Sequence, residues 1–220
     1  MNDRPSLREQ RRSEFVTTAM RVFDRKGAAN TSLRDVIHAM NHGKGVGMSV
    51  FYYYFKSKDD LIDACVRTYL ASYVDNVVDI LQNPDLSVQE ALDDICPHLI
   101  RAIWKMDVIF ADKANWYNYL STNSNVMEGF VRQIIDPLTK ALDRWLDRGD
   151  LPQTQLIQTA GTRTVAWLMA DGLSSIVSNG RGAAGHPQIR ELVRQRVRES
   201  VAFFSQLLGL PLKAPAIALS

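Results

Sequence analysis

Apolar residues recur at three- and four-residue steps through almost the whole chain, which is the period of amphipathic helices. Near the start, Phe15, Ala19 and Val22 share one face of such a helix. An S-x-x-E capping box at Ser6 predicts its beginning, and Gly27 is a natural end. The strict alternation of apolar and polar residues that is typical of half-buried strands is absent from the pattern. The sequence therefore predicts an all-α fold.

Two further short helices are predicted before residue 56. Ser32 caps the first of them, and a glycine-rich turn at residues 41–45 separates it from an aromatic run at residues 51–55. A short helix through this run would place Val50 and Phe51 in a small core. It would leave the tyrosine hydroxyls free for a polyanion, because tyrosine donates readily to phosphate oxygens. The alternative is an ordinary aromatic core, since short apolar runs are ambiguous.

The last two of the three short helices, joined by a turn, form the helix-turn-helix arrangement, in which the second helix of the pair enters the major groove of DNA. Three helices of this size bury little core. We therefore expect support from a long fourth helix, from Ser57 to about Asn83. The predicted domains are residues 1–56 for DNA binding, residues 57–209 for a larger helical domain, and residues 210–220 for a loose tail.

The larger domain also reads as helical throughout. Ser87 opens a further capping box, and Pro97 and Pro137 are expected to bend the helices that contain them. The predicted helices cover residues 87–104, 107–120, 125–146, 153–178 and 187–208.

Charge divides the chain in the same place as the helical pattern. Residues 1–58 hold 11 lysines and arginines against 5 acidic residues, a net charge of +6, whereas residues 59–220 hold 15 against 19, a net charge of −4. A basic module on an acidic body indicates that the module meets a polyanion. A chance fluctuation over a short segment is the alternative.

Other features of the composition narrow the class of protein. No apolar stretch reaches the roughly 18 to 20 residues that a transmembrane helix needs, and no signal peptide is readable, so we expect a cytoplasmic protein. Cys65 and Cys96 are the only cysteines, and two buried thiols are a better interpretation than a disulfide.

Two stretches carry a resemblance to a known family. TSLRDV at residues 31–36 resembles the opening of the second helix in the TetR family of bacterial regulators. FYYYFKSKDDL at residues 51–61 is similar to that family's recognition-helix exit and entry to the fourth helix. The match covers roughly residues 8–65. The resemblance implies a homodimeric transcriptional repressor that leaves a palindromic operator when a small molecule binds the larger domain.

The chain departs from the family pattern in two ways. The turn after Met40 is about four residues longer than the usual family turn, and residues 47–50 contain no Arg, Asn or Gln to pair with a base edge. We therefore expect DNA shape and apolar contacts to carry much of the specificity. Arg8, Arg11 and Arg12 are expected to help bind phosphates. The predicted DNA contacts are Thr31, Ser32, Lys44, Gly47, Met48, Ser49, Val50, Tyr52, Tyr53, Tyr54 and Lys58.

The resemblance also assigns roles in the larger domain. In the TetR family the last two helices pair with their copies as a four-helix dimer interface. The corresponding residues here are Ala160, Thr164, Val193, Val197, Val201 and Phe204, with ordinary packing inside one chain as the alternative. An effector pocket between helices, for a small apolar or aromatic molecule, would be lined by Trp104, Phe110, Trp116, Tyr117, Phe130, Trp145 and Trp167. These aromatic residues could equally form a plain helical core.

Competing functions have weaker support. Cys96 and His98 are too close and too few for a metal site, and no nucleotide-binding or hydrolase motif occurs. We therefore expect neither a cofactor nor a metal, and no enzymatic activity. A DNA-binding regulator that senses no small molecule is the more serious alternative, and an all-helical enzyme is a distant third.

Overall fold

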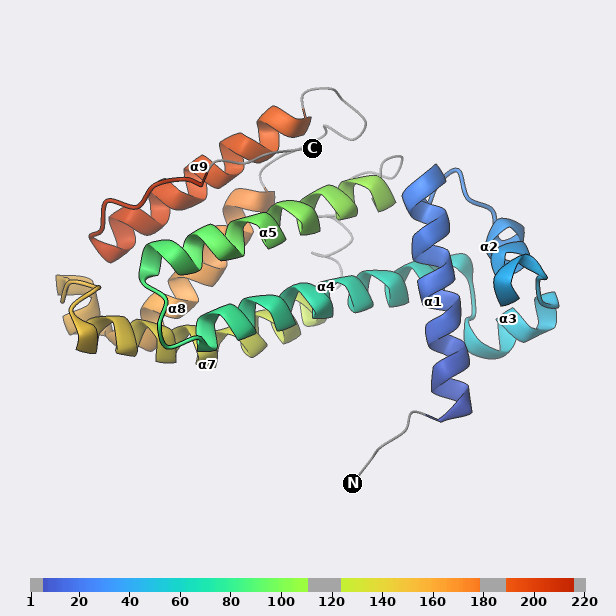
Figure 1. The fold of residues 1–220 in the computed structure, drawn as a ribbon, viewed down its shortest axis with the longest axis horizontal. Coiled ribbons are helices and arrows are strands. Elements are labelled where there is room, and N and C mark those ends of the chain that lie inside the picture. Colours follow the sequence, from blue (N-terminus) through green and yellow to red (C-terminus); the bar gives the residue numbers. More distant parts are fainter. Residues whose placement is uncertain (1–5, 111–123, 179–188, 216–220) are drawn as a thin grey trace.

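The computed structural model describes residues 6–110, 124–178 and 189–215, and the regular structure of these residues is helical, which confirms the all-α prediction. Figure 1 shows a small N-terminal module (α1, α2, η1 and α3) at one end of α4 and a larger body (α5, α7, α8 and α9) along the rest of it. No helix in the described part of the chain has the length and apolar character to cross a membrane. The elements are α1 (Leu7–Lys26), α2 (Leu33–Ala39), η1 (Asn41–Gly43), α3 (Met48–Tyr54), α4 (Lys58–Gln82), α5 (Val88–Phe110), α7 (Ser124–Arg148), α8 (Gln155–Ser178) and α9 (Ile189–Leu208).

Local signals place the ends of the module's helices. The Ser6 hydroxyl accepts the Glu9 N–H at 3.2 Å, and the Glu9 carboxylate accepts the Ser6 N–H at 2.7 Å. Ser32 and Asp35 repeat this reciprocal arrangement at the start of α2. Gly27, with φ of 73°, ends α1 in a backbone region that favours glycine. The predicted capping box at Ser6, the predicted cap at Ser32 and the predicted end of α1 are thus confirmed.

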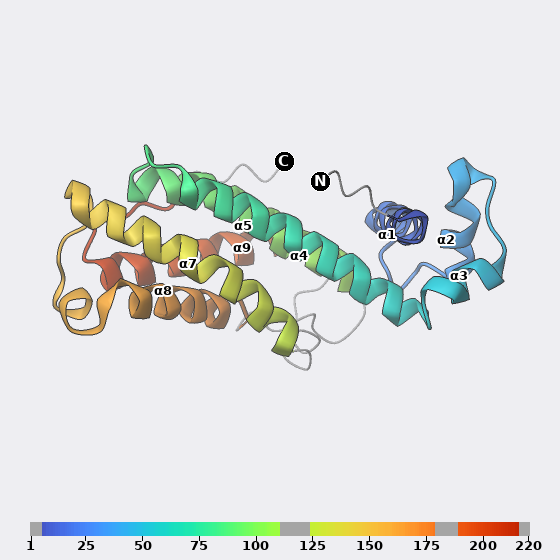
Figure 2. The same cartoon turned by 90° about the horizontal axis from the view of Figure 1, so that it is seen from below.

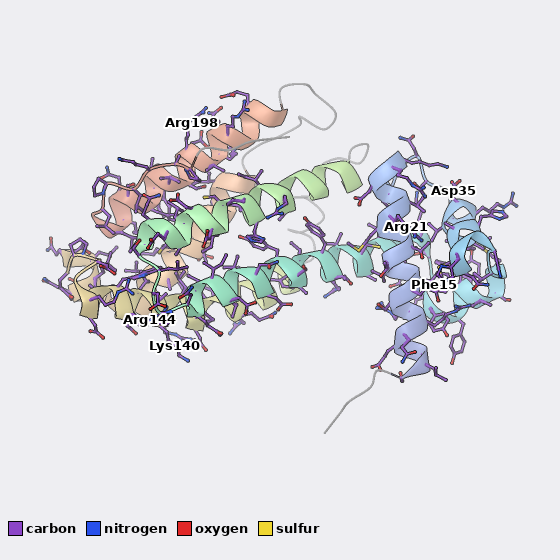
Figure 3. The ribbon with its side chains drawn as sticks, in the orientation of Figure 1. Phe15, Arg21, Asp35, Lys140, Arg144 and Arg198 are labelled. Carbon is purple, nitrogen blue, oxygen red and sulfur yellow. The ribbon has the colours of Figure 1, made fainter. Side chains whose placement is uncertain are left out.

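The core of the module is a cluster of aromatic rings. Phe15 on α1, labelled in Figure 3, lies 5.8 Å from Phe51 and 5.9 Å from Phe55, measured between ring centroids. All three rings are almost fully buried. The same apolar cluster continues into α4, from Leu61 as far as Leu70. The expected domain boundary at residue 57 is therefore the cap of a helix, and apolar packing continues across it.

Helix α4 joins the two parts of the molecule. Ser57 caps its N-terminus, and the helix then runs alongside α5 and α7, as Figures 1 and 2 show. In its second half, Val77 and Leu81 lie in the main apolar cluster of the body, together with residues of α7 and α8. One helix therefore contributes to both cores.

Helix α7 fastens the far end of α4. The Arg144 guanidinium donates to the Leu81 carbonyl at 2.5 Å, and the Trp145 indole N–H donates to the Leu86 carbonyl at 2.8 Å. Arg148 also donates to Leu86, at 2.8 Å. The last carbonyls of a helix lack donors within the helix and carry the negative end of its dipole, so the Arg144 guanidinium is well placed at Leu81. Trp145 and Arg148 hold the α4–α5 turn that follows.

Helix α5 differs from the prediction. The predicted capping box at its start is confirmed by reciprocal bonds between Ser87 and Glu90, but the helix continues without interruption through Asp107 to Phe110. A separate helix over residues 107–120 was expected. No glycine or proline separates Trp104 from Asp107, so helical hydrogen bonding simply continues. The rest of that predicted helix lies outside the described residues.

Helix α8 contains a break that the apolar pattern did not indicate. Gly161 has φ of 77° and ψ of 161°, which no residue of a regular helix adopts. On either side of this point the chain is helical, and the predicted helix over residues 153–178 is otherwise confirmed.

The tail after α9 is better ordered than expected. The Leu212 N–H donates to the Ser205 hydroxyl at 3.2 Å, and Leu212 also packs against the body. The Gln89 side chain exchanges two hydrogen bonds with the backbone of Lys213, at 2.9 and 3.0 Å. The expectation of a loose tail is therefore wrong for residues 210–213, because Gln89 supplies a donor and an acceptor that no periodicity in the tail could reveal.

Candidate nucleic-acid interface

Helix α3 has one buried and one exposed face. Phe51 is fully buried and Val50 is partly packed against the same core, as the helical interpretation of this run requires. Val50 is therefore less available to DNA than the sequence alone indicated. The exposed residues are Gly47, Met48, Ser49, Tyr52 and Tyr53. Tyr53 is the most exposed large side chain among them, at 65%. This face carries hydroxyl groups and a thioether but no formal charge.

Three of the predicted DNA contacts direct their side chains into the protein. Thr31 is 1% exposed, and its hydroxyl donates to the Gly27 carbonyl at 2.7 Å. The Lys58 ammonium donates to the Ala28 carbonyl, and the half-buried Tyr54 ring packs in the core of the module. The Thr31 hydroxyl is thus committed to the α1–α2 turn, which corrects its predicted contact with phosphate. Thr31 and Lys58 both support the turn that positions α2.

Ser32 forms the start of α2 together with Asp35. The Asp35 carboxylate accepts a hydrogen bond from Lys26 at 2.9 Å and two from Ser32. These bonds, that from Lys26 first, hold the pKa of the Asp35 carboxyl well below its ordinary value of 3.8. Lys26 balances the negative charge of this cap, so the cap adds little repulsion toward a polyanion.

Arginines at the start of α1 lie against the aromatic end of α3. The Arg8 guanidinium sits 5.5 Å from the centre of the Tyr53 ring, and Arg12 sits 4.9 Å from that of Phe55. Such cation–π contacts orient the guanidinium group. Arg11 instead pairs with Glu14 at 2.6 Å. These arginines were expected near phosphates. Their ring contacts join residues more than 40 positions apart, and a helical pattern carries no signal of such contacts.

The aromatic residues predicted for an effector pocket do not gather in one place among the described side chains. Trp145 is buried and its indole is bonded to the α4–α5 turn, so it belongs to the body core. Phe130, which lies 15 residues earlier on α7, packs against the core of the module. At a rise of 1.5 Å per residue, the two are about 22 Å apart along the helix, too far to line one small pocket.

The remaining pocket residues are divided between the core and the undescribed part of the chain. Trp167 is half-buried and packs against the cluster that contains Trp145. The side chains of the others lie outside the described residues, and they are Trp104, Phe110, Trp116 and Tyr117. Within the described residues, no group of three or more histidine, cysteine or acidic side chains could hold a metal ion.

The residues predicted for a dimer interface fall into two groups, one buried within the chain and one at least partly exposed. Val197 and Val201 on α9 are buried against Cys96 and Ile100 of α5, and Phe204 is buried as well. Their apolar stripe thus packs inside the chain, which corrects their assignment to a surface between copies. On α8, in contrast, Thr164 is exposed and Ala160 is half-buried. The Val193 side chain lies outside the described residues.

Comparison with known families supports the interpretation of the module. Residues 15–65 match the family model described as "Bacterial regulatory proteins, tetR family". This range contains most of α1, all of α2 and α3, and the first turns of α4. A search of curated proteins found no match to the chain.

Solved structures extend the likeness to the whole fold. A transcriptional regulator from Cytophaga hutchinsonii aligns over 87% of this chain and 95% of its own, with a TM-score of 0.65 and 12% identity. A TetR-family regulator from Pectobacterium atrosepticum aligns over 94% and 97%, with a TM-score of 0.58 and 18% identity. A TetR/AcrR-family regulator from Thermobifida fusca aligns over 87% and 96%, with a TM-score of 0.57 and 19% identity. The chain therefore carries an N-terminal segment that matches the TetR family model, and its whole fold is similar to that of these regulators.

Proposed function

We propose that this regulator binds a palindromic DNA site as a homodimer and represses transcription until a small apolar or aromatic molecule in the body releases it. The observation that carries the proposal is the exposed face of α3, rich in hydroxyl groups, on a module of net charge +6. A positive field attracts the duplex, and hydroxyl groups are common donors to phosphates and base edges. The body is acidic, so it is the module that faces the DNA.

The exposed residues of α3 contact different parts of the DNA in this proposal. Met48, Ser49 and Tyr52 lie at and after its N-terminal end, the part of a recognition helix that contacts base edges. Met48 suits thymine methyl groups, and the hydroxyls of Ser49 and Tyr52 can bond to bases. Tyr53, oriented by Arg8, suits the phosphate backbone. Because α3 offers no bidentate side chain, DNA shape contributes a large share of the specificity.

The dimer surface that fits the described residues is the outer face of α8 with that of α9. Thr164, Leu168 and Asp171 are exposed and follow one another at helical spacing, and Leu168 is a large apolar side chain that is 41% exposed. On α9, Ala202 and Gln206 are exposed. Pairing these faces about a two-fold axis would present two α3 helices to two half-sites.

The dimer proposal has a direct test. Leu168→Glu would bury a charge between the copies, so sedimentation should report a shift from dimer toward monomer. Lys140→Gln, on α7, serves as the surface control. A Leu168→Glu variant that remains as dimeric as the control would contradict this assignment.

Helix α4 is the proposed route from effector to DNA, because it contributes to the cores of both the module and the body. In its middle, burial raises the pKa of the Tyr73 hydroxyl, and burial raises the pKa of the nearby Cys96 thiol to about 12. Such an apolar interior suits an apolar or aromatic effector. The effector must bind a body conformation with a different tilt of α4 more tightly than the DNA-bound one, since otherwise no equilibrium shifts.

The second candidate is a DNA-binding regulator that responds to no small molecule. It is favoured by the position of Trp145 in the core and by the wide separation of Trp145 and Phe130. A screen of apolar and aromatic compounds for release of a bound duplex separates the two candidates. Ligands that bind the body without releasing DNA would support the second.

The first experiment is selection of bound duplexes from genomic fragments at about 0.15 M salt, followed by sequencing. We expect a palindromic site with two half-sites. Ser49→Ala should relax the selected sequence, whereas Tyr53→Phe should weaken binding to all duplexes alike. Uniform recovery of every fragment by the unmodified protein would contradict sequence-specific regulation through α3.

A further inference from the structure

The turn between α2 and α3 (residues 41–45, the α2–α3 turn) has an unusual backbone. Asn41 and His42 adopt φ of 54° and 56°, and Gly43 follows at 85°. This left-handed region is disfavoured for residues with a side chain, although asparagine and histidine enter it more often than most. Two such residues in succession persist only where the surroundings hold them, and strain of this kind concentrates at functional sites.

Several contacts hold the α2–α3 turn in place. The Met40 carbonyl accepts two N–H groups, from Gly43 at 3.1 Å and from Gly45 at 2.9 Å, and the Met40 side chain is fully buried. The Asn41 N–H donates to the Glu14 carboxylate on α1 at 3.3 Å, and that carboxylate is itself paired with Arg11. The longer turn therefore has a defined conformation that is anchored to α1 and to the core.

The anchored turn presents polar side chains to solvent. Asn41, His42 and Lys44 are exposed, and no hydrogen bond or ion pair joins their side chains to other residues in the described part of the chain. Residues 41–57 contain no aspartate or glutamate. In Figures 1 and 2 the turn lies at the outer end of the module, away from the body, and leads directly into the N-terminus of α3.

The turn supplies the classes of side chain that α3 lacks. Helix α3 exposes no amide, imidazole or ammonium group, and the turn offers one of each within four residues. All three donate to phosphate oxygens, and amide and ammonium groups are among the commonest such donors in DNA complexes. Because the N-terminal end of a recognition helix lies deepest in the major groove, the segment just before it borders the same groove.

We infer that the α2–α3 turn is a second DNA-contacting segment, in which Asn41, His42 and Lys44 bind the phosphate backbone beside the base pairs met by α3. The inference rests on the proposed DNA-binding function and extends the predicted contact at Lys44 to Asn41 and His42 in the same turn. A turn that is already held in one conformation loses little conformational entropy on binding. Its contacts therefore raise the affinity more than the same contacts from a flexible loop would. The footprint of each module should accordingly be wider than α3 alone would produce.

Two variants and a control test this inference. Lys44→Gln removes the charge at a residue with ordinary helical φ of −79°, so the backbone is undisturbed. A double variant, Asn41→Gly with His42→Gly, removes both side chains and keeps a residue type that tolerates the left-handed backbone. Lys140→Gln is the matched control, because Lys140 is exposed on α7, far from the module (Figure 3).

The measurements use the duplex recovered most strongly by the unmodified protein. We expect Lys44→Gln to lower the slope of log affinity against log salt by about 1 for each module, and Lys140→Gln to leave it unchanged. Ethylation of individual phosphates should interfere with binding at positions beside the α3 half-site, and the double glycine variant should lose that interference. Circular dichroism should show all variants to be folded.

The result that would overturn the inference is a salt slope and an interference pattern that both variants share with the unmodified protein. The proposed function would survive that result, because the unmodified protein would still bind its duplex. Failure of the unmodified protein to bind any duplex would instead overturn the proposed function together with this extension. If the double variant does not fold, Lys44→Gln remains decisive.

Discussion

The N-terminal module and the body are both helical assemblies built on α4, but they are held together differently. In the module, the rings of Phe15, Phe51 and Phe55 contact one another in one continuous apolar cluster. In the body, the described apolar residues form two clusters, and polar side chains of α7, such as Arg144, fasten the end of α4 through its carbonyls. The module thus depends on apolar contact and the body also on directional bonds.

This difference indicates how a rearrangement of the body could reach the module through α4. The first half of α4 is embedded in the module core and must move with it. The second half is attached to the body by hydrogen bonds at one end and by apolar packing along its length. A rearrangement of the body can therefore shift α4 as a unit with the module while the module keeps its internal structure. The following experiments test whether the module and the body behave as separate regions.

The largest expected effect is on thiol reactivity, which reports on each region separately. Cys65 lies in the module core and Cys96 in a small cluster of the body, and burial raises the pKa of both thiols from 9.0 to about 12. Because the thiolate is the reactive form, we expect alkylation at pH 8 to be about a thousandfold slower than for a free cysteine. Mass spectrometry of the labelled peptides would measure both rates.

The same labelling in rising urea shows which region opens first. We expect Cys96 to react first, because its cluster is the smaller one. The raised pKa also has a consequence for stability. The folded chain keeps thiol protons that the unfolded chain releases above about pH 9, so the free energy of unfolding should fall as the pH rises from 9 toward 12. Equal labelling of both thiols at every urea concentration would mean that the two regions open together.

The next effect concerns the module core. Phe51→Ala removes a fully buried ring that contacts Phe15 and Phe55, and we expect the free energy of unfolding to fall by about 3 to 5 kcal/mol. Tyr53→Ala, on the exposed face of the same helix, should change it by no more than about 0.5 kcal/mol. Trp145 and Trp167 belong to the main apolar cluster of the body, so their fluorescence reports on that cluster. If Phe51→Ala shifted the unfolding curve measured by fluorescence as much as the one measured by circular dichroism, the module and the body would not be separate regions.

A smaller effect is expected where α8 meets α9. A Cβ atom at Gly172 would lie 2.3 Å from the Phe203 ring, whereas one at Gly129 on α7 would meet nothing within 4 Å. Gly172→Ala should therefore cost about 1 to 3 kcal/mol as the ring is forced to move. Gly129→Ala should be neutral or stabilise by up to about 1 kcal/mol, because alanine favours helix. Urea denaturation followed by fluorescence distinguishes them, and equal effects would contradict the close approach of the two helices.

The smallest effect concerns Trp145. Trp145→Phe removes the indole N–H that bonds the Leu86 carbonyl, and we expect a loss of about 1 to 2 kcal/mol in the free energy of unfolding. Trp167→Phe, at a half-buried residue, should cost less. A Trp145→Phe variant with unchanged stability but an altered response to effector would restore the pocket role that its burial argues against.

Local chemistry explains why most helix ends could be predicted. Ser6 with Glu9 and Ser32 with Asp35 are reciprocal caps between residues three positions apart, so both partners are visible in the sequence. The inward position of Phe51 was also readable, because its neighbours on the helix define an apolar face. Helix α5 shows the limit of this approach, since a break was expected near residue 107 although no glycine or proline lies between Trp104 and Asp107 to cause one.

What the sequence determined by itself is therefore the all-helical class, the three-helix module and its exposed recognition helix. The tertiary structure alone decided how the remaining faces are used. An apolar stripe such as Val197 and Val201 reports that a face is buried, but not whether α5 or a second copy covers it. The Thr31 hydroxyl likewise turned to the Gly27 carbonyl, and Trp145 to that of Leu86. In each case the partner that covers or bonds the side chain is brought there by the course of the backbone through the fold. A periodic pattern in the sequence carries no information about that course.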